Sequence, residues 1–311
     1  MCSSEIRELD FIIIGVQKGG TTSLWEWLRA HPEIAMPNAK EAPIFFLAPE
    51  QIPEALEMLV GRAIDGRSGE LRVGKAATQY MMGINGTAVE VVAERIARSL
   101  PGVRLIALLR DPIDRAISHY RMSVRRGFEA RPFDAVVEEL LEPENLEVAR
   151  SCATETNSYL VQGEYARILQ HYRQRIPDEQ IHIESTEDLD REPGLVLDRV
   201  LAFLGLPGEY RPEDLGVRYH VGGTQRRLDG EELAQLRAYL DEHVWSKLGD
   251  QRKLAKFEFN SFLTLWNVIP DSRRPALSEV NRRRLEVHYR ADARALPSMG
   301  VRAPWLASWK S

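Results

Sequence analysis

The chain has 311 residues, of which 44% are hydrophobic and 28% are charged, an ordinary composition for a globular protein. Its 41 lysines and arginines against 46 aspartates and glutamates give a formal net charge of −5, so no general attraction to nucleic acid or to an anionic membrane is indicated. Any anion site must be built locally. Two cysteines, Cys2 and Cys152, provide neither a disulfide framework nor a metal-binding spacing, which favours a reducing compartment.

The first apolar run is residues 11–14, which are rich in β-branched side chains and are followed by Gly15. This pattern predicts a buried strand. A glycine-containing loop comes next, and then a helix with Leu24, Trp25 and Leu28 on one face. A strand, a glycine turn and a helix start present backbone N–H groups and the positive end of a helix dipole to a phosphate.

The loop can be compared with the Walker A loop, which has two glycines five residues apart, then lysine, then serine or threonine. Gly15 and Gly20 keep the glycine spacing and Thr22 keeps the hydroxyl, but Thr21 stands in the lysine position. The loop's lysine is Lys18, three residues earlier. The glycines that shape a phosphate-binding loop are therefore present, but the lysine is in a different position from that of a Walker A loop. This difference predicts a ligand with fewer phosphates in line.

Two segments after the first helix carry candidate charged residues. Lys40 and Glu41 precede a proline and an aromatic pair, which predicts a loop anchored by its aromatic residues; an ordinary solvated charge pair is an equal alternative. Residues 71–77 are predicted to form a strand that contains Lys75, and Tyr80 follows it. A solvated lysine is again the alternative for Lys75.

A second strand is predicted at 103–109, followed by Arg110 and a helix that starts with Asp111 as N-cap and Pro112 at its first position. Ser118 lies about two helical turns past the cap, so its hydroxyl and the Arg110 guanidinium can converge on a phosphate. Asp111 as a magnesium ligand is the competing interpretation. His119 lies about 100° away from Ser118 on the helix, so we predict packing or a surface position for it, although it stays the alternative base to Glu41.

The remaining predicted elements alternate between helices and strands. Residues 125–132 are predicted as a basic loop, the acidic stretch after residue 141 as a loop and residues 187–189 as a turn. Residues 218–228 form a glycine-containing basic loop in which Thr224, Arg226 and Arg227 are candidate phosphate contacts. The other predictions are helices at 53–60, 88–100, 132–141, 159–175, 195–204 and 231–241, a strand at 180–185, and a last helix capped by Ser278.

These motifs together resemble the sulfotransferases that use 3′-phosphoadenosine 5′-phosphosulfate (PAPS), in particular the carbohydrate and bacterial branch that includes heparan sulfate sulfotransferase domains. The segment 17–24, QKGGTTSL, is similar to the family's 5′-phosphosulfate loop, and Arg110 with Ser118 in an RDPxxRxxSxY context is similar to its 3′-phosphate site. Lys75 and Tyr80 match the family's Glu-Lys-Ser/Thr-Pro-x-Tyr motif, whereas Gly74, Ala76 and Ala77 depart from it.

The resemblance implies a role for each motif. Lys18, Glu41 and Lys75 would be catalytic: Lys18 at the departing phosphate, Glu41 as general base and Lys75 near the sulfuryl group or the acceptor. No metal is expected. The residues implied in binding PAPS, or its product 3′-phosphoadenosine 5′-phosphate (PAP), are Gln17, Lys18, Gly19, Gly20, Thr21, Thr22, Ser23, Arg110, Ser118, Thr224, Arg226 and Arg227.

The sequence therefore predicts one α/β domain over residues 1–311, with a P-loop-like three-layer fold of helices on a central parallel sheet. Residues 126–157 are a possible acceptor-site insertion and residues 228–311 a C-terminal helical part. Golgi members carry a membrane anchor ahead of the catalytic domain and no such segment is found in this sequence, so we predict a cytoplasmic bacterial enzyme without a membrane span. A magnesium-dependent P-loop kinase and a non-catalytic nucleotide-binding protein are the alternatives. The acceptor, a carbohydrate, lipid or secondary metabolite, stays open.

Overall fold

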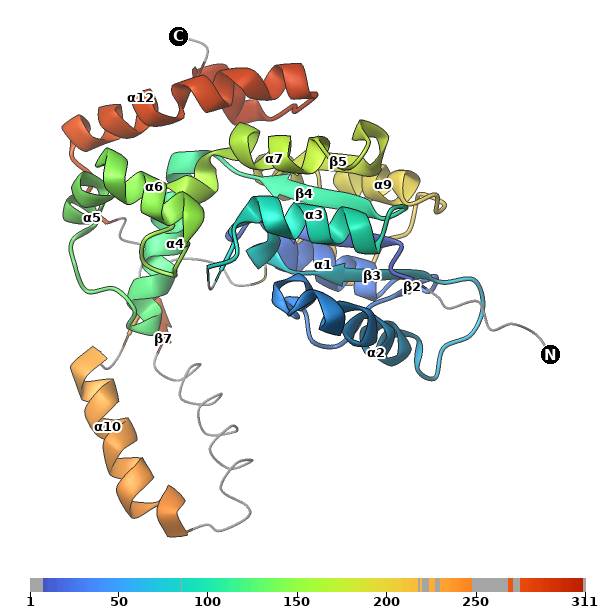
Figure 1. Ribbon diagram of the computed structural model, residues 1–311, viewed down its shortest axis with the longest axis horizontal. Helices are drawn as coiled ribbons and strands as arrows, with labels where there is room; N and C mark the ends of the chain where they lie inside the picture. Colours follow the sequence, from blue (N-terminus) through green and yellow to red (C-terminus); the bar gives the residue numbers. More distant parts are fainter. Residues whose placement is uncertain are drawn as a thin grey trace.

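The structure is a computed structural model (Figure 1), and the description below covers residues 8–84, 86–217, 219, 224–226, 230–247, 268–270 and 275–309. A parallel sheet of five strands in the order β2-β3-β1-β4-β5 lies at its centre. The strands are β1 (Phe11–Gly15), β2 (Ile34–Ala35), β3 (Arg72–Ala76), β4 (Arg104–Leu109) and β5 (Ile181–Ser185).

Both faces of this sheet are buried, as expected of parallel strands connected by helices. Alternate residues of β1 enter different cores: Ile12 and Ile14 belong to the larger core, whereas Phe11 and Ile13 belong to the smaller one. The helices are α1 (Thr21–Arg29), α2 (Ile52–Ile64), α3 (Val89–Ser99), α4 (Pro112–Arg126), α5 (Phe133–Leu140), α6 (Pro143–Ser151), α7 (Tyr165–Arg173), α8 (Thr186–Arg191), α9 (Pro193–Phe203), α10 (Gly230–His243) and α12 (Glu279–Ala295). The larger core contains residues of α2, α3, α7 and α12, and the smaller core contains residues of α1 and α9.

The three-layer α/β fold predicted from the sequence is confirmed, as are the predicted strands along it. The Asp111 N-cap is confirmed too: its carboxylate accepts from the backbone N–H groups of Ile113 and Asp114 at 3.0 Å each. Ser278 likewise caps α12 by accepting from the N–H of Asn281.

Three local predictions are wrong. The predicted loop at 125–132 begins inside α4, which continues to Arg126 and ends at Gly127 in the left-handed conformation. The predicted acidic loop contains α6, whose buried side chains, Leu146 and Ala149, are too few to give a clear periodic pattern. The predicted turn at 187–189 lies within α8, a helix too short for periodicity to reveal, which Ser185 caps by accepting from the N–H of Asp188.

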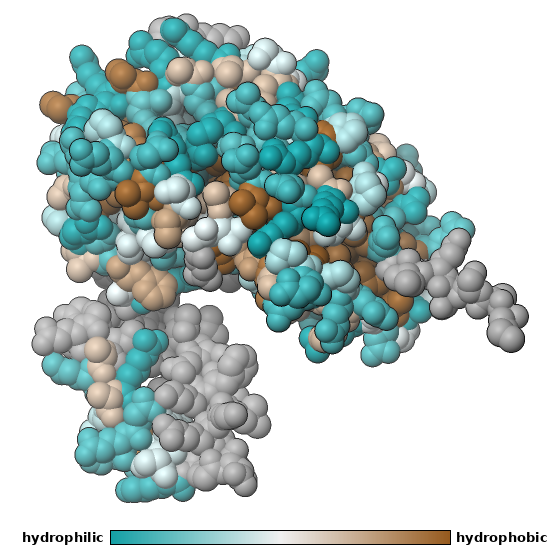
Figure 2. Space-filling view, in the orientation of Figure 1, coloured by the Kyte–Doolittle hydropathy of each residue, from teal (hydrophilic) through white to brown (hydrophobic). Residues whose placement is uncertain are grey.

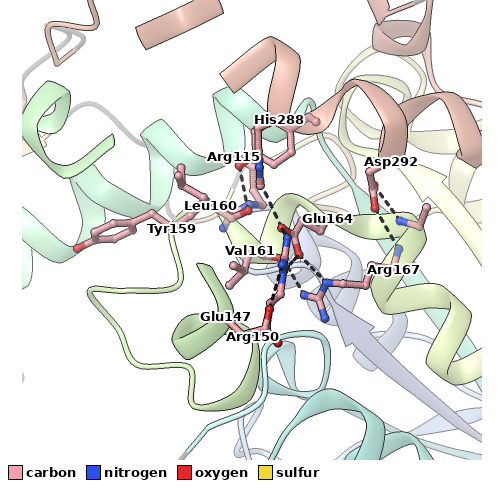
Figure 3. A network of polar contacts seen from close by, with 12 residues as sticks. Arg115, Glu147, Arg150, Tyr159, Leu160, Val161, Glu164, Arg167, His288 and Asp292 are labelled. Carbon is pink, nitrogen blue, oxygen red and sulfur yellow. Dashed lines mark hydrogen bonds and ion pairs between the residues drawn. The ribbon is translucent and has the colours of Figure 1, made fainter. Parts of the chain in front are cut away.

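A polar network joins α6, α7 and α12 on the larger-core side (Figure 3). Glu164, which is buried, accepts from Arg150 at 2.7 and 3.0 Å and from Arg167 at 2.5 Å, and the ring of His288 lies 3.3 Å away. Asp292 accepts the N–H groups of two residues at the start of α7. This network borders a cavity of about 560 Å³, here called the helix cavity.

The segments between α9 and α12 include elements that do not belong to the central sheet. Strands β6 (Thr224–Arg226) and β7 (Val268–Pro270) pair antiparallel, and α10 projects away from the main body (Figure 1). The face in Figure 2 is mostly hydrophilic, with apolar residues in small separate groups. Among the described helices, none has the length and apolar character needed to span a bilayer.

Candidate functional site

The loop between β1 and α1 has a backbone that requires its glycines. A Cβ on Gly19 would lie 2.6 Å from the carbonyl oxygen of Leu108, and a Cβ on Gly20 would lie 2.8 Å from a methyl group of Leu189. Gly20 also has φ 88°, the left-handed conformation that glycine adopts without strain, and Lys18 has φ 71°. The loop therefore curls tightly over the carboxyl end of β4.

The start of α1 is open to a ligand. Gly20 is the N-cap and has no side chain to cap the helix. The first N–H groups of a helix have no partner within the helix, so those of Thr21, Thr22 and Ser23 can bind an anion. These residues line a cavity of about 570 Å³, here called the loop cavity. Gln17 Oε1, at the base of the loop, is buried without a hydrogen-bond partner in the described structure.

Lys18 places its ammonium group in a region of positive charge. Burial lowers the pKa of Lys18, and so do the neighbouring cations Arg125, Arg126, Arg110 and Lys40, in that order, to about 8. A cation held among cations is stabilised by an arriving anion, so this arrangement favours a negatively charged ligand.

Glu41 lies beside the end of β3, where its backbone forms a parallel bridge with Ala76, and two contacts hold its carboxylate. Its carboxylate accepts the backbone N–H of Thr78 at 3.0 Å and lies 2.7 Å from the Lys40 ammonium. Lys40 also donates to Thr21 Oγ1 at 3.2 Å, which connects the carboxylate to the first turn of α1. The side chain of Glu41 is 35% exposed, so a carboxylate of fixed position faces the loop cavity.

Lys75 lies inside β3 and does not belong to the lining of the loop cavity. It is fully buried, and its Nζ has no hydrogen-bond partner in the described part of the chain. The centroid of the Tyr80 ring lies 5.8 Å from Nζ. Burial lowers the pKa of Lys75 to about 7, although the charge of Glu41 raises it. An unpaired buried cation is an unfavourable arrangement that suggests a function.

The β4–α4 junction brings Arg110 and Ser118 together in the loop cavity. Arg110 donates to the carbonyl of Lys18 at 3.4 Å, and its own carbonyl accepts from the Tyr165 hydroxyl at 2.8 Å. Asp111 receives the Trp309 indole N–H at 3.1 Å in addition to its capping bonds. Both oxygens of the Asp111 carboxylate therefore accept hydrogen bonds from the protein itself, which argues against the interpretation of Asp111 as a magnesium ligand.

His119 on α4 is packed inside the protein and does not line the loop cavity, in agreement with the packing role that its helical position predicted. The ring is completely buried, 3.4 Å from a carboxylate oxygen of Glu155 and 3.4 Å from the Arg115 guanidinium. Burial, more than any neighbour, lowers the pKa of His119 to about 4. A neutral, buried imidazole that does not line the loop cavity has no access to an acceptor there.

Several residues of the loop cavity were not predicted from the sequence, among them two arginines that follow the predicted Ser118 along α4. Ser118, Arg121 and Arg125 occupy positions i, i+3 and i+7 of α4 and share one face, a spacing that could have been found if the helix had been extended past residue 124. The further lining residues not predicted as site residues are Lys40, Thr78, Gln79, Asp114, Ile117, Met122, Arg126, Thr186, Leu189, Asp190 and Tyr219.

Two regions that were predicted to contribute to the site remain. One contributes little to the lining of the loop cavity, and the other lies partly outside the described residues. Of residues 126–157, the described cavity lining includes only Arg126. The backbone of β6 approaches α4, which brings Thr224 and Arg226 near this side of the molecule. Arg227 lies outside the described residues.

The chain is similar in sequence and in structure to known sulfotransferases. A model of the sulfotransferase domain matches residues 8–216. The heparan sulfate glucosamine 3-O-sulfotransferases 3B1 and 3A1 of Homo sapiens are each 32% identical over 255 residues, which are 73% of this chain and 59% and 57% of those proteins. The chain thus spans less than two thirds of their length. A crystal structure of a sulfotransferase from Alicyclobacillus acidocaldarius matches with 26% identity and a TM-score of 0.55, over 76% of this chain and 92% of that one.

Proposed function

The chain belongs to the sulfotransferase family, and we propose that it transfers the sulfuryl group of PAPS to a hydroxyl of a carbohydrate, lipid or secondary-metabolite acceptor. One observation carries the proposal: the Glu41 carboxylate, held by Thr78 and Lys40, faces the same cavity as the Lys18 loop and the start of α1. A base and an anion-binding loop in one cavity are the two parts that such a transfer requires.

The residues present fit the donor nucleotide. The loop backbone approaches so closely that no side chain fits at Gly19, and the N–H groups of Thr21 and Thr22 would hold the 5′-phosphate with their hydroxyls. Arg110 and Ser118 would hold the 3′-phosphate by charge-assisted hydrogen bonds. Gln17, whose buried Oε1 has no hydrogen-bond partner among the described residues, and Ser23 complete the set of proposed contacts from the loop. We also propose Thr224, Arg226 and Arg227 as contacts to the phosphates of the nucleotide.

In the reaction, the acceptor oxygen forms a bond to sulfur on the side opposite the departing 5′-phosphate oxygen, whose bond to sulfur breaks. Bound PAPS supplies the activated sulfuryl group. Glu41 accepts the proton of the acceptor hydroxyl, a role worth roughly 10²–10⁴-fold in rate. Lys18 places positive charge where the 5′-phosphate gains negative charge, an electrostatic contribution that grows toward the transition state.

Lys40 and Lys75 both act on Glu41 in this proposal. Lys40 donates to the carboxylate and to Thr21, and so fixes the distance between the base and the donor loop. Lys75 lies in β3 and interacts electrostatically with the base, since the charge of Glu41 raises the pKa of Lys75 against the effect of burial. As Glu41 gains the acceptor proton, both ammonium groups lose part of their counter-charge and favour the anionic sulfuryl oxygens nearby.

Glu41→Gln tests the proposed base. It keeps the side-chain shape and an oxygen that can accept from Thr78, but removes the basic carboxylate. We expect turnover of PAPS with an acceptor that the wild type sulfates to fall roughly 10²–10⁴-fold, with the affinity for PAP unchanged within about threefold. Asp114→Asn, which changes another carboxylate of the loop cavity, is the matched control. Near-normal turnover of Glu41→Gln would remove Glu41 from the mechanism.

A further inference from the structure

A short segment near the C-terminus packs against the start of α4. This 3₁₀-helical segment, η9 (Pro304–Trp309), has both of its tryptophans buried. The Trp309 indole N–H donates to Oδ2 of Asp111 at 3.1 Å, although the two residues are 198 positions apart in the sequence. The indole nitrogen of Trp305 is also buried, but it has no hydrogen-bond partner among the described residues. One of the two tryptophans therefore makes a polar contact to the residue that follows Arg110.

The Trp309 bond completes the hydrogen bonding of the Asp111 carboxylate. Oδ1 of Asp111 caps α4 by accepting from the N–H groups of Ile113 and Asp114, which leaves Oδ2 for the indole. Burial raises the pKa of Asp111, whereas the hydrogen bonds from Asp114 and Trp309 lower it, so these donors favour the carboxylate form. A buried carboxylate oxygen that lost its donor would turn toward another partner, because an unpaired buried charge is unfavourable.

Arg110 precedes this carboxylate in the chain and lines the loop cavity. Its guanidinium donates to the carbonyl of Lys18 at 3.4 Å rather than to the adjacent Asp111. Its own carbonyl accepts from the Tyr165 hydroxyl at 2.8 Å, and the Tyr165 ring lies 6.1 Å from that of Trp305. An ion pair with Asp111 would neutralise the positive charge of Arg110 that a phosphate requires. A carboxylate that is bonded elsewhere leaves this guanidinium available to a phosphate.

We propose that Trp309 is a positioning residue for the donor nucleotide: by holding the Asp111 carboxylate, it keeps the Arg110 guanidinium available to the 3′-phosphate. This inference rests on the proposed function, in which Arg110 binds that phosphate. It gives the C-terminal segment a role in donor recognition, although no residue of η9 belongs to the described lining of the loop cavity. The effect of Trp309 on binding must therefore pass through Asp111.

The test compares two nucleotides that differ only in the 3′-phosphate, PAP and adenosine 5′-phosphate, by calorimetry. The ratio of their dissociation constants measures recognition of the 3′-phosphate. Trp309→Phe keeps an aromatic ring and removes the indole N–H. We expect it to lower the affinity for PAP roughly 3–10-fold, because an indirect effect should be smaller than the loss of a direct phosphate contact. The affinity for adenosine 5′-phosphate should change less than about twofold.

Trp305→Phe is the matched control. It makes the same substitution in the same segment but removes an N–H that has no partner among the described residues, so the ratio should not change. Asp111→Asn supplies a second background. There, Trp309→Phe should have no further effect on the ratio, since the carboxylate through which the indole acts has been removed. Denaturant unfolding of each variant establishes that it is folded under the conditions of the titration.

An unchanged ratio in Trp309→Phe would overturn the inference. An equal loss of affinity for both nucleotides would overturn it as well, because a general loss of structure gives that result. The same change of ratio with and without Asp111→Asn would mean that the tryptophan acts by another route, which is a third contradiction. A wild type that binds the two nucleotides equally would contradict the assignment of Arg110 in the proposed function, and the inference with it.

Discussion

The loop cavity and the helix cavity have almost the same volume, about 570 and 560 Å³, but they differ in the balance of charged side chains that line them. In the helix cavity the charges are matched: Glu164 lies between Arg150 and Arg167, and Asp292 accepts two backbone N–H groups (Figure 3). In the loop cavity six cationic side chains face three carboxylates among the described lining residues.

This difference in charge balance indicates that the polar network at the helix cavity stabilises the fold, whereas the charged residues of the loop cavity are arranged to bind an anionic ligand. Buried charges in a folded protein are normally paired, because desolvation of a lone charge is unfavourable. The Glu164 network follows this rule and ties three helices together. Lys75 departs from this rule, because its Nζ has no hydrogen-bond partner among the described residues. The described lining of the loop cavity has three more cationic side chains than carboxylates, an arrangement that an anionic ligand would stabilise. Changes in the two cavities should therefore have different consequences.

The largest effect on stability is expected from Glu164→Gln. Burial raises the pKa of Glu164, but His288, Arg150 and Arg167 together lower it to about 2. Since its ordinary value is 4.5, the carboxylate stabilises the fold above pH 4.5, and this contribution is lost as the pH falls toward 2. Loss of the charge should lower the free energy of unfolding by about 3 kcal/mol at neutral pH, and PAP affinity should not change.

Denaturant unfolding of Glu164→Gln and of Glu147→Gln measures this effect. Glu147 contacts the same Arg150 at 3.3 Å but its side chain is 76% exposed, so its loss should change stability by less than about 1 kcal/mol. If the two variants were equally stable, or if the acid-induced loss of stability between pH 4.5 and 2 were the same in Glu164→Gln as in the wild type, the helix cavity would not have the structural role given to it.

Arg110→Ala should give the converse result, a loss of ligand affinity with little loss of stability. A charge-assisted hydrogen bond to a phosphate contributes about 1.5–3 kcal/mol, so the affinity for PAP should fall roughly 10–100-fold. Adenosine 5′-phosphate lacks the 3′-phosphate and serves as the control ligand; its affinity should change by less than about threefold. Equal weakening of both nucleotides in calorimetry would contradict the assignment of Arg110 to the 3′-phosphate.

Sequence patterns predicted those parts of the fold and site that depend on local chemistry. The strand at 11–14, the tight loop at Gly19 and Gly20, and the Asp111 cap all follow from residues close together in the chain. The α4 face was predicted only as far as Ser118, because the basic pair at 125–126 next to Gly127 was interpreted as a loop. Gly127 in fact ends the helix as a left-handed residue after it.

The contacts that give the site its charge distribution could not be predicted in this way. Lys40 bonds to Thr21 across 19 positions of sequence, and that pairing exists only because β3 and the loop end at the same edge of the sheet. The burial of Lys75 also needs the fold, since a lysine near the end of a strand is solvated unless helices cover both faces of the sheet. Both residues act on Glu41, so the surroundings of the proposed base are a property of the tertiary structure.

Lys75→Met is the sharpest test of the contrast, because it should raise stability and reduce activity together. Methionine has a similar volume and no charge to desolvate, so the free energy of unfolding should rise by about 1–2 kcal/mol at pH 7. The pKa of Lys75 is lowered from 10.5 to about 7, so the unfolded chain holds this proton more tightly. Wild-type stability should therefore rise as the pH increases from 7 to 10.5, and the advantage of Lys75→Met should be full below pH 7 and vanish near pH 10.5.

Lys40→Met provides the matched comparison, because Lys40 is a lysine with partners at 2.7 and 3.2 Å beside the same carboxylate. It should lose activity without any gain in stability, since it removes an ion pair rather than an unpaired charge. Unfolding curves of the wild type and both variants at pH 7 and pH 10, with turnover at pH 7, separate the two lysines. If Lys75→Met destabilised the protein at pH 7, the ammonium would have a partner that stabilises it, and Lys75 would belong with the paired charges of the helix cavity.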